Sequence, residues 1–568
     1  METFGKTLQK QRETSATVAP VGRHVLRLGA VFFLLLGGLA STIFVGPTLG
    51  AGRATTGTTT GTADTTTTST ARSVLAVSGH GWGHGLGLSQ WGAYGYAQHG
   101  WTYDRILAHY YPGTTLGPAK VGTVRVLLAS AKRATIAAAA PSTVADASGP
   151  HADGTAQTLV VKPSGVAGQP SLQLPLTITS RRPLSVNGKT YRGKLAVSTD
   201  GKLVQVVDVL GLEAYLKGVV PSEMPSNWPA EALQAQAVAA RSYALANLTK
   251  GRGFDLYGDT RDQAYGGVAA ESPSASAAID ATKGQVVLYK DRVADTLYFS
   301  TSGGRTASSL ESTGTAVPYL VPVADPYDTL SPYHDWGPVL FDAAGLVKQL
   351  KLSAPIADVQ AVDGASGRVK TLTVVSEDDA QVTLSGNQVR AALGLRSTWF
   401  TPALLQLLPA ARTMTFGGAV TLSGFARGVD ELSLESKAAG EKAWSPAGDV
   451  SLAADGRFAT IVKPAVTTQY RLAWGDVRAG LARIAVAPRV DAAASPAGVQ
   501  GSIHPAAVSA AVQLQQQDGT SWTTVDSTVT DATGAWSFAG ALQPGTYRVR
   551  CAPGHGLAPG VSTSLVVE

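Results

Sequence analysis

The sequence GLEAYLKGVVPSEMPSNWPAEALQAQAVAARSYALANL, Gly211 to Leu248, carries the clearest pattern in this 568-residue chain. Pro229 suits the first position of a helix, because the N–H that proline lacks would be unpaired there in any case. Beyond it, apolar side chains recur at helical spacing on one face. They are Leu233, Ala237, Ala240, Ala244 and Leu248. The stretch therefore predicts one long helix that runs from Pro229 to about residue 249.

Arg241 falls within that apolar face, since each residue of a helix turns the chain by ~100°. An unpaired charge inside a protein is costly, so this guanidinium must be paired or must line a cavity. We predict that Arg241 positions a ligand or tunes a carboxylate. A buried structural ion pair is the alternative.

Glu223 lies just before the predicted helix, between Pro221 and Pro225. The prolines predict a stiff, non-helical segment. Valine, proline, methionine and tryptophan surround the carboxyl in the sequence, and burial among them raises a carboxyl pKa. Such a group keeps a proton near neutral pH, as a general acid must. A nearby Arg241 would lower the pKa instead, and an exposed loop glutamate remains the alternative.

The composition limits the classes of protein to consider. Hydrophobic residues make up 44% and charged residues 15% of the chain, which predicts several globular domains. The net charge of +6 favours polyanionic partners. Dense runs of Lys and Arg are absent from the sequence beyond the N-terminus, so we expect no nucleic-acid partner. Cys551 is the one cysteine, which excludes disulfides within the chain and cysteine-based zinc sites.

The first 72 residues predict export. A basic segment, 1–27, precedes an uncharged apolar run at 28–46, which is near the length needed to span a bilayer. The charge asymmetry places the N-terminus in the cytoplasm and the rest at the outer face of the cytoplasmic membrane, in the cell wall. A cleaved signal peptide is the alternative. Residues 47–72, rich in threonine, predict a flexible linker.

The remaining chain predicts three parts. Residues 73–402 mix helices and strands, and a β-rich insert at about 121–215 has turns at Asn187-Gly188 and Asp200-Gly201 that favour hairpins. Residues 410–489 and 490–568 carry two related series of strand-like pieces. They predict two all-β, immunoglobulin-like sandwich modules, which we interpret as spacers, with binding modules as the alternative.

The stretch SGHGWGHGLGLSQWGAYGYAQHG, Ser78 to Gly100, alternates glycine with large side chains. If it is extended, its glycines share one face, and His80, Trp82 and His84 share the other. A glycine face admits a second backbone or a flat sugar ring. A tightly packed strand and turn is the alternative. The two histidines have the spacing of a metal pair on a helix, but this segment is not helical, so we expect no metal.

Several stretches resemble the signature motifs of the SpoIID/LytB family of cell-wall proteins. They are Glu213–Leu245, Gly284–Thr306, Ser331–Trp336 and Ser366–Phe400, together with a glycine-histidine block that starts at Ser78 and continues to Thr114. The resemblance covers roughly 73–120 and 183–402. The glycine-histidine block here precedes the Glu223 block, which is the reverse of the order in sporulation members and is similar to actinobacterial-type members.

The resemblance implies an α+β catalytic domain that acts as a peptidoglycan lytic transglycosylase without a cofactor. Such enzymes cleave the MurNAc-β-1,4-GlcNAc bond of glycan strands stripped of stem peptides and leave 1,6-anhydroMurNAc ends. The family's catalytic acid corresponds to Glu223 and its motif arginine to Arg241. One carboxylate suffices, because the sugar's own C6 hydroxyl is held close enough to attack. The expected substrate contacts are Trp82, His84, Ser89, Gln90, Arg241, Asp262, Gln263, Tyr265, Ser302, Gly303 and Gly304.

Two other functions stay open. Some relatives are described as enhancers of a cell-wall amidase, and such a protein would bind glycan without cleaving it. A surface scaffold is the other alternative, because an anchor, a linker and tandem β modules fit it. The enzyme hypothesis expects the glycine-histidine block and the Glu223 segment to meet in space.

Overall fold

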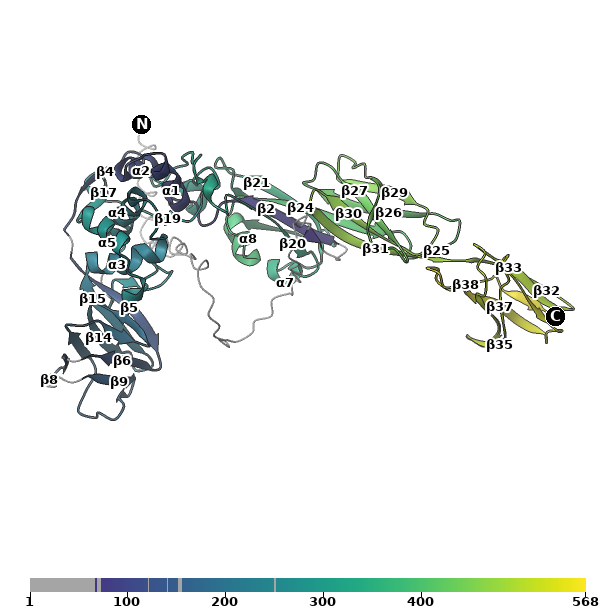
Figure 1. Ribbon diagram of the computed structural model, residues 1–568, viewed down its shortest axis with the longest axis horizontal. Coiled ribbons are helices and arrows are strands. Elements are labelled where there is room, and N and C mark those ends of the chain that lie inside the picture. Colours follow the sequence, from purple (N-terminus) through teal and green to yellow (C-terminus); the bar gives the residue numbers. More distant parts are fainter. Residues whose placement is uncertain (1–66, 69–72, 121, 140, 152–155, 250–251) are drawn as a thin grey trace, which may run out of the picture.

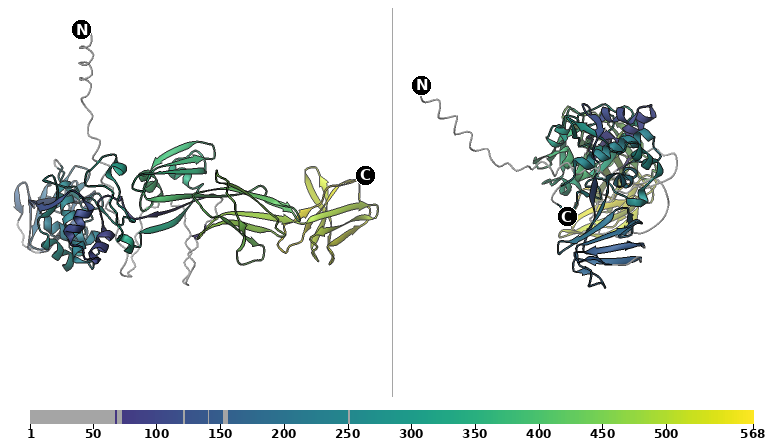
Figure 2. Two further views of the ribbon diagram at one scale, coloured as in Figure 1. Left: turned by 90° about the horizontal axis from the view of Figure 1, so that it is seen from above. Right: turned by 90° about the vertical axis from the view of Figure 1, so that its left-hand side faces the viewer.

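The computed structural model describes residues 67–68, 73–120, 122–139, 141–151, 156–249 and 252–568 (Figure 1). The predicted segments 1–27 and 28–46 lie outside these residues, as does nearly all of the predicted linker 47–72. Within the described part, no helix is long and apolar enough to cross a membrane. The molecule is elongated, with a helix-rich body towards one end and strands alone at the other (Figures 1 and 2).

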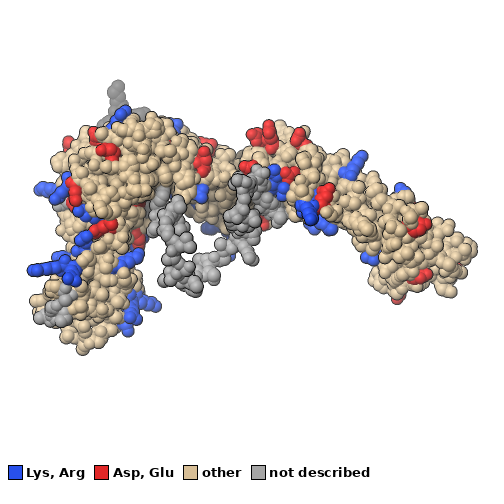
Figure 3. Space-filling model, viewed as in Figure 1, with Lys and Arg blue, Asp and Glu red and all other residues tan. Residues whose placement is uncertain are grey.

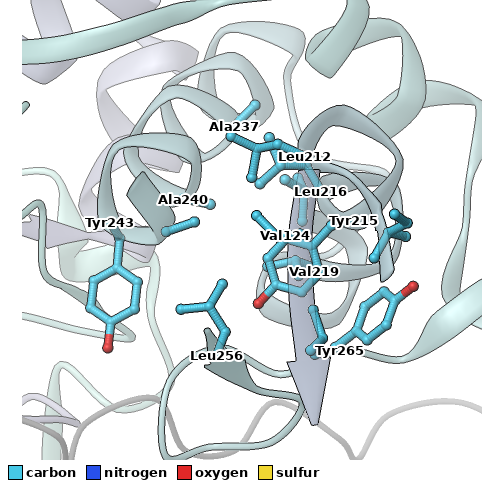
Figure 4. Close-up of a cluster of buried hydrophobic side chains, with 14 of the residues drawn as sticks. Val124, Leu212, Tyr215, Leu216, Val219, Ala237, Ala240, Tyr243, Leu256 and Tyr265 are labelled. Atoms are coloured by element: carbon cyan, nitrogen blue, oxygen red, sulfur yellow. The ribbon is translucent and has the colours of Figure 1, made fainter. Parts of the chain in front are cut away.

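Helix α4 (Ala230–Ala246) is the centre of the helix-rich body, and it confirms the helix predicted from the sequence. Alanines let the neighbouring elements approach closely, and nearly every α4 side chain from Ala232 to Ala244 is buried. Around α4 pack α1 (Gln90–Gln98), α2 (Tyr103–Tyr110), α3 (Leu212–Glu223), α5 (Pro273–Ala281) and β17 (Gln285–Tyr289). Figure 4 shows α3 and α4 side chains such as Leu216 and Ala240 meeting in one apolar core.

Short strands complete this body: β3 (Leu88–Ser89), β4 (Thr115–Pro118), β16 (Leu256–Tyr257), β18 (Arg292–Val293) and β19 (Tyr298–Phe299). The parallel pair of β3 and β19 joins the glycine-histidine block to a segment more than 200 residues later in the chain. Two 3-10 helices, η1 (Gly267–Ala270) and η2 (Asp328–Leu330), and the short helix α6 (Ser309–Thr313) lie in the connections.

A β lobe, residues 120–211, extends from the helix-rich body. Its strands are β5 (Thr123–Ala131), β6 (Ala134–Ala138), β7 (Ser142–Asp146), β8 (Gly149–His151), β9 (Gln157–Lys162), β10 (Gly165–Val166), β11 (Leu176–Ser180), β12 (Leu184–Val186), β13 (Lys189–Tyr191), β14 (Lys194–Thr199) and β15 (Val204–Gly211). They form two sheets, in the orders β10-β9-β6-β12-β13 and β16-β5-β15-β14-β11-β7-β8. Both predicted hairpins are confirmed, since β12 pairs with β13 across Asn187-Gly188 and β14 with β15 across Asp200-Gly201.

Strand β2 (Ser73–His80) lies in the middle of the molecule. Its neighbours are β20 (Asp335–Asp342) and β24 (Phe400–Pro409), and the same sheet continues through β26 (Val420–Arg427) and β29 (Arg457–Val462). One sheet therefore spans the predicted boundary at 402–410 and contains strands from both sides of it. Beside it stand the sheet β21 (Ile356–Asp363), β22 (Val369–Ser376) and β23 (Gln381–Ser385) and the helices α7 (Leu346–Leu350) and α8 (Gly386–Leu393).

The C-terminal residues are all strands and turns. One group comprises β25 (Thr413–Thr415), β27 (Ser433–Ala438), β28 (Ser445–Asp449), β30 (Thr468–Trp474) and β31 (Val477–Ala487), which the short strand β1 (Thr67–Thr68) joins. The last group comprises β32 (Arg489–Ser495), β33 (Gly498–His504), β34 (Ala511–Asp518), β35 (Ser521–Val529), β36 (Ala535–Ala539), β37 (Gly545–Ala552), β38 (Gly560–Val561) and β39 (Leu565–Val567). It has a core of its own. The immunoglobulin-like character of these groups stays a prediction.

Arg241 is fully buried and ties α4 to α3. Its guanidinium donates from Nε and Nη2 to the two carboxylate oxygens of Glu213, at 2.9 and 2.7 Å. It also donates to the carbonyl oxygens of Ile279 and Gln285. The guanidinium thus connects α4 with α3, α5 and β17, and its pair with Glu213 is the structural ion pair that the sequence left as an alternative.

We expect Arg241→Met to lower the free energy of unfolding by about 3–5 kcal/mol, because it leaves the Glu213 carboxylate partly buried and without its partner. Urea denaturation of the full chain measures this change. Arg241→Met combined with Glu213→Leu should recover much of the loss, because the second change removes the stranded charge. Equal stability of the single variant and the wild type would contradict the role of the pair.

Candidate functional site

Glu223 is the last residue of α3, and the residue is only 8% exposed. The prediction of a non-helical segment is wrong here. Pro221 removes one N–H from the last turn, but the helix still closes, since the Met224 N–H donates to the Val220 carbonyl oxygen. Pro225 follows directly and prevents the helix from continuing. The carboxyl group is therefore fixed at a helix end.

The Glu223 carboxyl has a raised pKa. Burial among apolar groups raises it from the ordinary value to about 7, and a hydrogen bond from the Ala264 N–H to Oε1, 2.8 Å long, opposes the shift. Arg241 does not pair with Glu223, because Glu213 takes its guanidinium. A carboxyl group whose pKa is raised to about 7 keeps a substantial protonated fraction at neutral pH.

The glycine-histidine block meets the Glu223 segment directly. The Gln90 side-chain amide donates to the backbone carbonyl oxygen of Glu223 at 2.9 Å. Ser89 caps α1 by accepting from the Gly92 N–H, and its Oγ also accepts from the Ser302 N–H. Three segments that are far apart in the sequence therefore converge, as the sequence predicted for the first two.

The glycines of the block do not form one extended face. Gly81, Gly83, Gly85 and Gly87 all have positive φ, between +73° and +122°, so regular alternation ends where β2 ends. Any side chain at Gly87 would overlap the Leu297 carbonyl oxygen, and one at Gly83 would lie 2.7 Å from Phe299 Cβ. These glycines admit another stretch of the same chain, which corrects the interpretation of a face open to sugar.

Most of the predicted contact residues are buried. Trp82, His84 and Gly304 are partly exposed. Buried are Ser89, Gln90, Arg241, Asp262, Gln263, Tyr265, Ser302 and Gly303. Gln263, for example, is fully buried and donates to the Ala240 carbonyl oxygen and to the Tyr298 hydroxyl. The buried side chains position the site, and a direct sugar contact from Arg241, Gln263 or Ser302 is incompatible with their complete burial.

The loop 300–304 is held from beneath by Asp328, which is fully buried. Asp328 Oδ2 accepts from the Ser302 hydroxyl at 2.7 Å and from the Gly303 N–H at 2.6 Å, while Oδ1 lies 2.6 Å from His334 Nδ1. Arg368 donates from the other side to the carbonyl oxygens of Ser302 and Arg305. The loop is thus a rigid wall beside the glycine-histidine block.

Three aromatic side chains gather at the segment that follows Glu223, and the sequence did not predict that they meet. Trp91 and Tyr94 on α1 meet Trp228, which follows Glu223 by five residues, with ring centroids 4.8 and 4.7 Å from that of Trp228. All three are partly exposed. Both tryptophans belong to the motif blocks, SQWGA and SNWP. Their position in these blocks was the sign in the sequence that they lie at the site.

Two open pockets lie elsewhere on the described structure. One, of about 310 Å³, is lined by Ser78, Gly79, His80, Asp335, Trp336, Gly337 and Thr401. The other, of about 510 Å³, is lined by Arg192, Glu213, Ala214, Lys217, Glu271, Ser276, Asp280 and Lys283. Neither includes Glu223. Among the described residues, no group of three or more His, Cys, Asp or Glu side chains is arranged to hold a metal ion.

Comparisons with known proteins identify relatives of one part of the chain. A family model described as SpoIID, Stage II sporulation protein, matches residues 200–289. The chain is 40% identical over 139 residues to an uncharacterized protein of Brachyspira hyodysenteriae, a match covering 24% of this chain and 38% of that protein. It is 37% identical over 140 residues to the amidase enhancer of Bacillus subtilis, covering 25% of this chain and 19% of that protein.

A longer match joins the chain to Stage II sporulation protein D of Bacillus subtilis, at 29% identity over 248 residues, with 40% of this chain and 71% of that protein covered. The chain spans only about two fifths of the Brachyspira protein and a fifth of the amidase enhancer. The segment that the family model matches contains α3, α4 and Glu223, and by this segment the chain belongs to the SpoIID family.

Proposed function

We propose that this protein is an exported lytic transglycosylase of peptidoglycan, with Glu223 as its single acid and base. The observation that carries the proposal is a buried carboxyl at a helix end whose pKa is raised to about 7. Membership of the SpoIID family and the names of the relatives support a role at the cell wall. In this proposal, the anchor and linker predicted from the sequence hold the protein at the outer face of the cytoplasmic membrane.

The reaction proceeds with one carboxyl group. Protonated Glu223 donates its proton to the glycosidic oxygen as the bond from MurNAc C1 breaks. The C6 hydroxyl of the same MurNAc attacks C1, and the Glu223 carboxylate accepts the proton that this hydroxyl loses. The product is a 1,6-anhydroMurNAc end, no water is consumed, and Glu223 returns to its protonated form. The Ala264 N–H stabilises the carboxylate between the two proton transfers.

Trp91, Tyr94 and Trp228 supply the surface on which a sugar ring packs in this proposal. A pyranose presents C–H groups on its faces, and a tryptophan ring offers a broad apolar partner at small entropic cost. Trp228 reaches this place because Pro225 and Pro229 fix the short segment after Glu223. The same segment thus carries the acid and positions one part of the sugar-binding surface.

A second candidate is an enhancer of a cell-wall amidase. The relative named amidase enhancer favours it, since 140 residues of this chain match that protein at 37% identity. In this case the protein binds glycan strands and recruits or activates the amidase without cleaving the strand. The purified wild-type chain decides between the two functions. A transglycosylase forms anhydro ends on glycan strands, whereas an enhancer forms none.

We expect Glu223→Gln to reduce the formation of anhydroMurNAc ends by about 10²–10⁴-fold, because the amide cannot transfer the proton. Mass spectrometry of products from peptide-free glycan strands measures this. The matched control is Glu377→Gln, which changes an exposed carboxylate in the turn after β22. It should retain full activity, and equal activity of both variants would exclude Glu223 as the acid.

We expect kcat/KM to fall as the pH rises through about 7, the pKa of Glu223, because only the protonated carboxyl can act on the leaving oxygen. A pH profile from 5 to 9 on peptide-free strands tests this. A basic limb that stays flat to pH 9 would contradict the assignment. Thermal unfolding over the same range serves as the control for loss of the fold.

We expect Trp228→Ala to weaken glycan binding roughly 10-fold, because about 1.4 kcal/mol is lost with the ring, and Trp228→Tyr to keep most of it. Binding is measured by co-sedimentation with insoluble peptide-free strands in a Glu223→Gln background, so that no substrate is consumed. Trp522→Ala, at a partly exposed tryptophan in the C-terminal strands, is the matched control. Equal loss in both variants would overturn the assignment of the aromatic group.

A further inference from the structure

The β lobe concentrates the positive charge of the molecule. Residues 120–211 contain 11 Lys and Arg against 4 Asp and Glu, a net charge of +7, while the whole chain carries +6. The rest of the chain is therefore nearly neutral, with a net charge of −1. These basic residues are spread singly or in pairs along 92 positions, so the sequence shows no basic run there.

Ten of the eleven basic residues are exposed, and nine of these ten form no ion pair with any residue that the structure describes. They are Lys120, Lys132, Arg133, Lys162, Arg181, Arg182, Lys189, Lys194 and Lys202. The other two are paired outside the lobe, Arg125 with Asp255 and Arg192 with Glu271. The charge on this surface is thus available to a partner.

The acidic residues of the lobe do not compensate this charge. Asp208 is fully buried, and burial raises its pKa to about 6. Asp146 pairs with His151 and accepts from the N–H groups of Ser148, in its own turn, and of Gln173. Asp200 accepts from the N–H groups of Lys202 and Leu203. Asp153, the fourth acidic residue, lies outside the described residues.

The strand register gathers the cations at two ends of the lobe. At the end away from the helices, Ala134 lies opposite Val161, and Ala131 lies opposite Val204. This places five cations close together: Lys132, Arg133, Lys162, Lys189 and Lys202. At the end near the helices, Ile178 pairs with Leu195, so that Arg181, Arg182 and Lys194 are neighbours. In Figure 3, blue side chains appear on both flanks of this lobe.

We propose that the β lobe binds a linear, flexible polyanion of the cell wall, a glycopolymer with phosphodiester groups repeated along its chain. The two groups of cations are separated by about the length of β14, six residues or roughly 20 Å, which one extended chain can span and a single small anion cannot. The proposal goes beyond glycan cleavage and does not depend on the chemistry of Glu223.

The surface does not suit a membrane. Proteins that dock on anionic lipid by a cationic surface usually combine it with apolar side chains that enter the interface. Eleven large hydrophobic residues are exposed on the described structure, and none belongs to the lobe. The cations also occupy opposite ends of the lobe instead of one plane. A flexible polymer can follow such a surface, whereas a flat bilayer or a rigid duplex touches one part of it.

The test uses the full chain and poly(glycerol phosphate) of defined length, with binding measured by fluorescence anisotropy at 50 and 500 mM salt. Replacing three cations, in Lys132→Gln/Arg133→Gln/Lys162→Gln, should raise Kd about tenfold, since each exposed charge contributes roughly 0.5 kcal/mol. High salt should abolish the difference between variant and wild type.

The matched control is Lys442→Gln/Lys463→Gln/Arg483→Gln, which removes the same number and kinds of exposed charge from the C-terminal strands. It should leave Kd within about twofold of the wild-type value, because those cations lie outside the lobe. An equal loss in both triple variants would show attraction by net charge alone and overturn the proposal. Tighter binding to duplex DNA or to vesicles of anionic phospholipid than to the polymer would overturn the choice of partner.

Formation of anhydro ends from glycan strands that lack the polymer should be the same in the lobe variant and the wild type. This measurement separates the polymer surface from the cleavage site. Normal polymer binding by the lobe variant would contradict the proposal, even if Glu223→Gln is inactive. If the lobe variant loses polymer binding but Glu223→Gln keeps its activity, the polymer surface is supported and the assignment of the acid is not.

Discussion

The bidentate pair between Arg241 and Glu213 determines how the helix-rich body is assembled. Because both carboxylate oxygens and two backbone carbonyls accept from one guanidinium, α3 and α4 meet in a single arrangement. Glu223 lies at the end of α3, eleven residues from its start, so the pair also determines where that carboxyl group is held. Arg241, a charged residue on an apolar helix face, thus helps to fix the position of Glu223.

The sequence predicted the features that depend on residues close together in the chain. The spacing of apolar residues after Pro229 gave α4, the Asn187-Gly188 and Asp200-Gly201 turns gave two hairpins, and the apolar neighbours of Glu223 indicated its burial. The role of Arg241 was harder to predict, because its partner Glu213 lies 28 residues away in the sequence and on another helix. The exported location, the anchor and the linker stay predictions, since they concern residues outside the described part.

Long-range contacts explain the remaining differences. The glycines from Gly81 to Gly87 have positive φ and receive residues 297–302, Ala307 and Arg368, whereas the sequence left open whether a second backbone or a sugar ring lies against them. The cations of the β lobe stand far apart in the sequence and gather only when hairpins fold back on each other. Trp91 and Trp228 likewise become neighbours only through the packing of α1 beside the segment that follows Glu223.

The position of β2 has a mechanical consequence. The long described part of the chain begins at Ser73, in a strand that has antiparallel partners on both sides, β20 and β24. A force applied at this residue along the strand loads both ladders in shear, so many hydrogen bonds must break together before the strand moves. Since β2 lies between the helix-rich body and the C-terminal strands (Figure 1), a force applied from the N-terminal side acts near the middle of the elongated molecule and not at one of its ends.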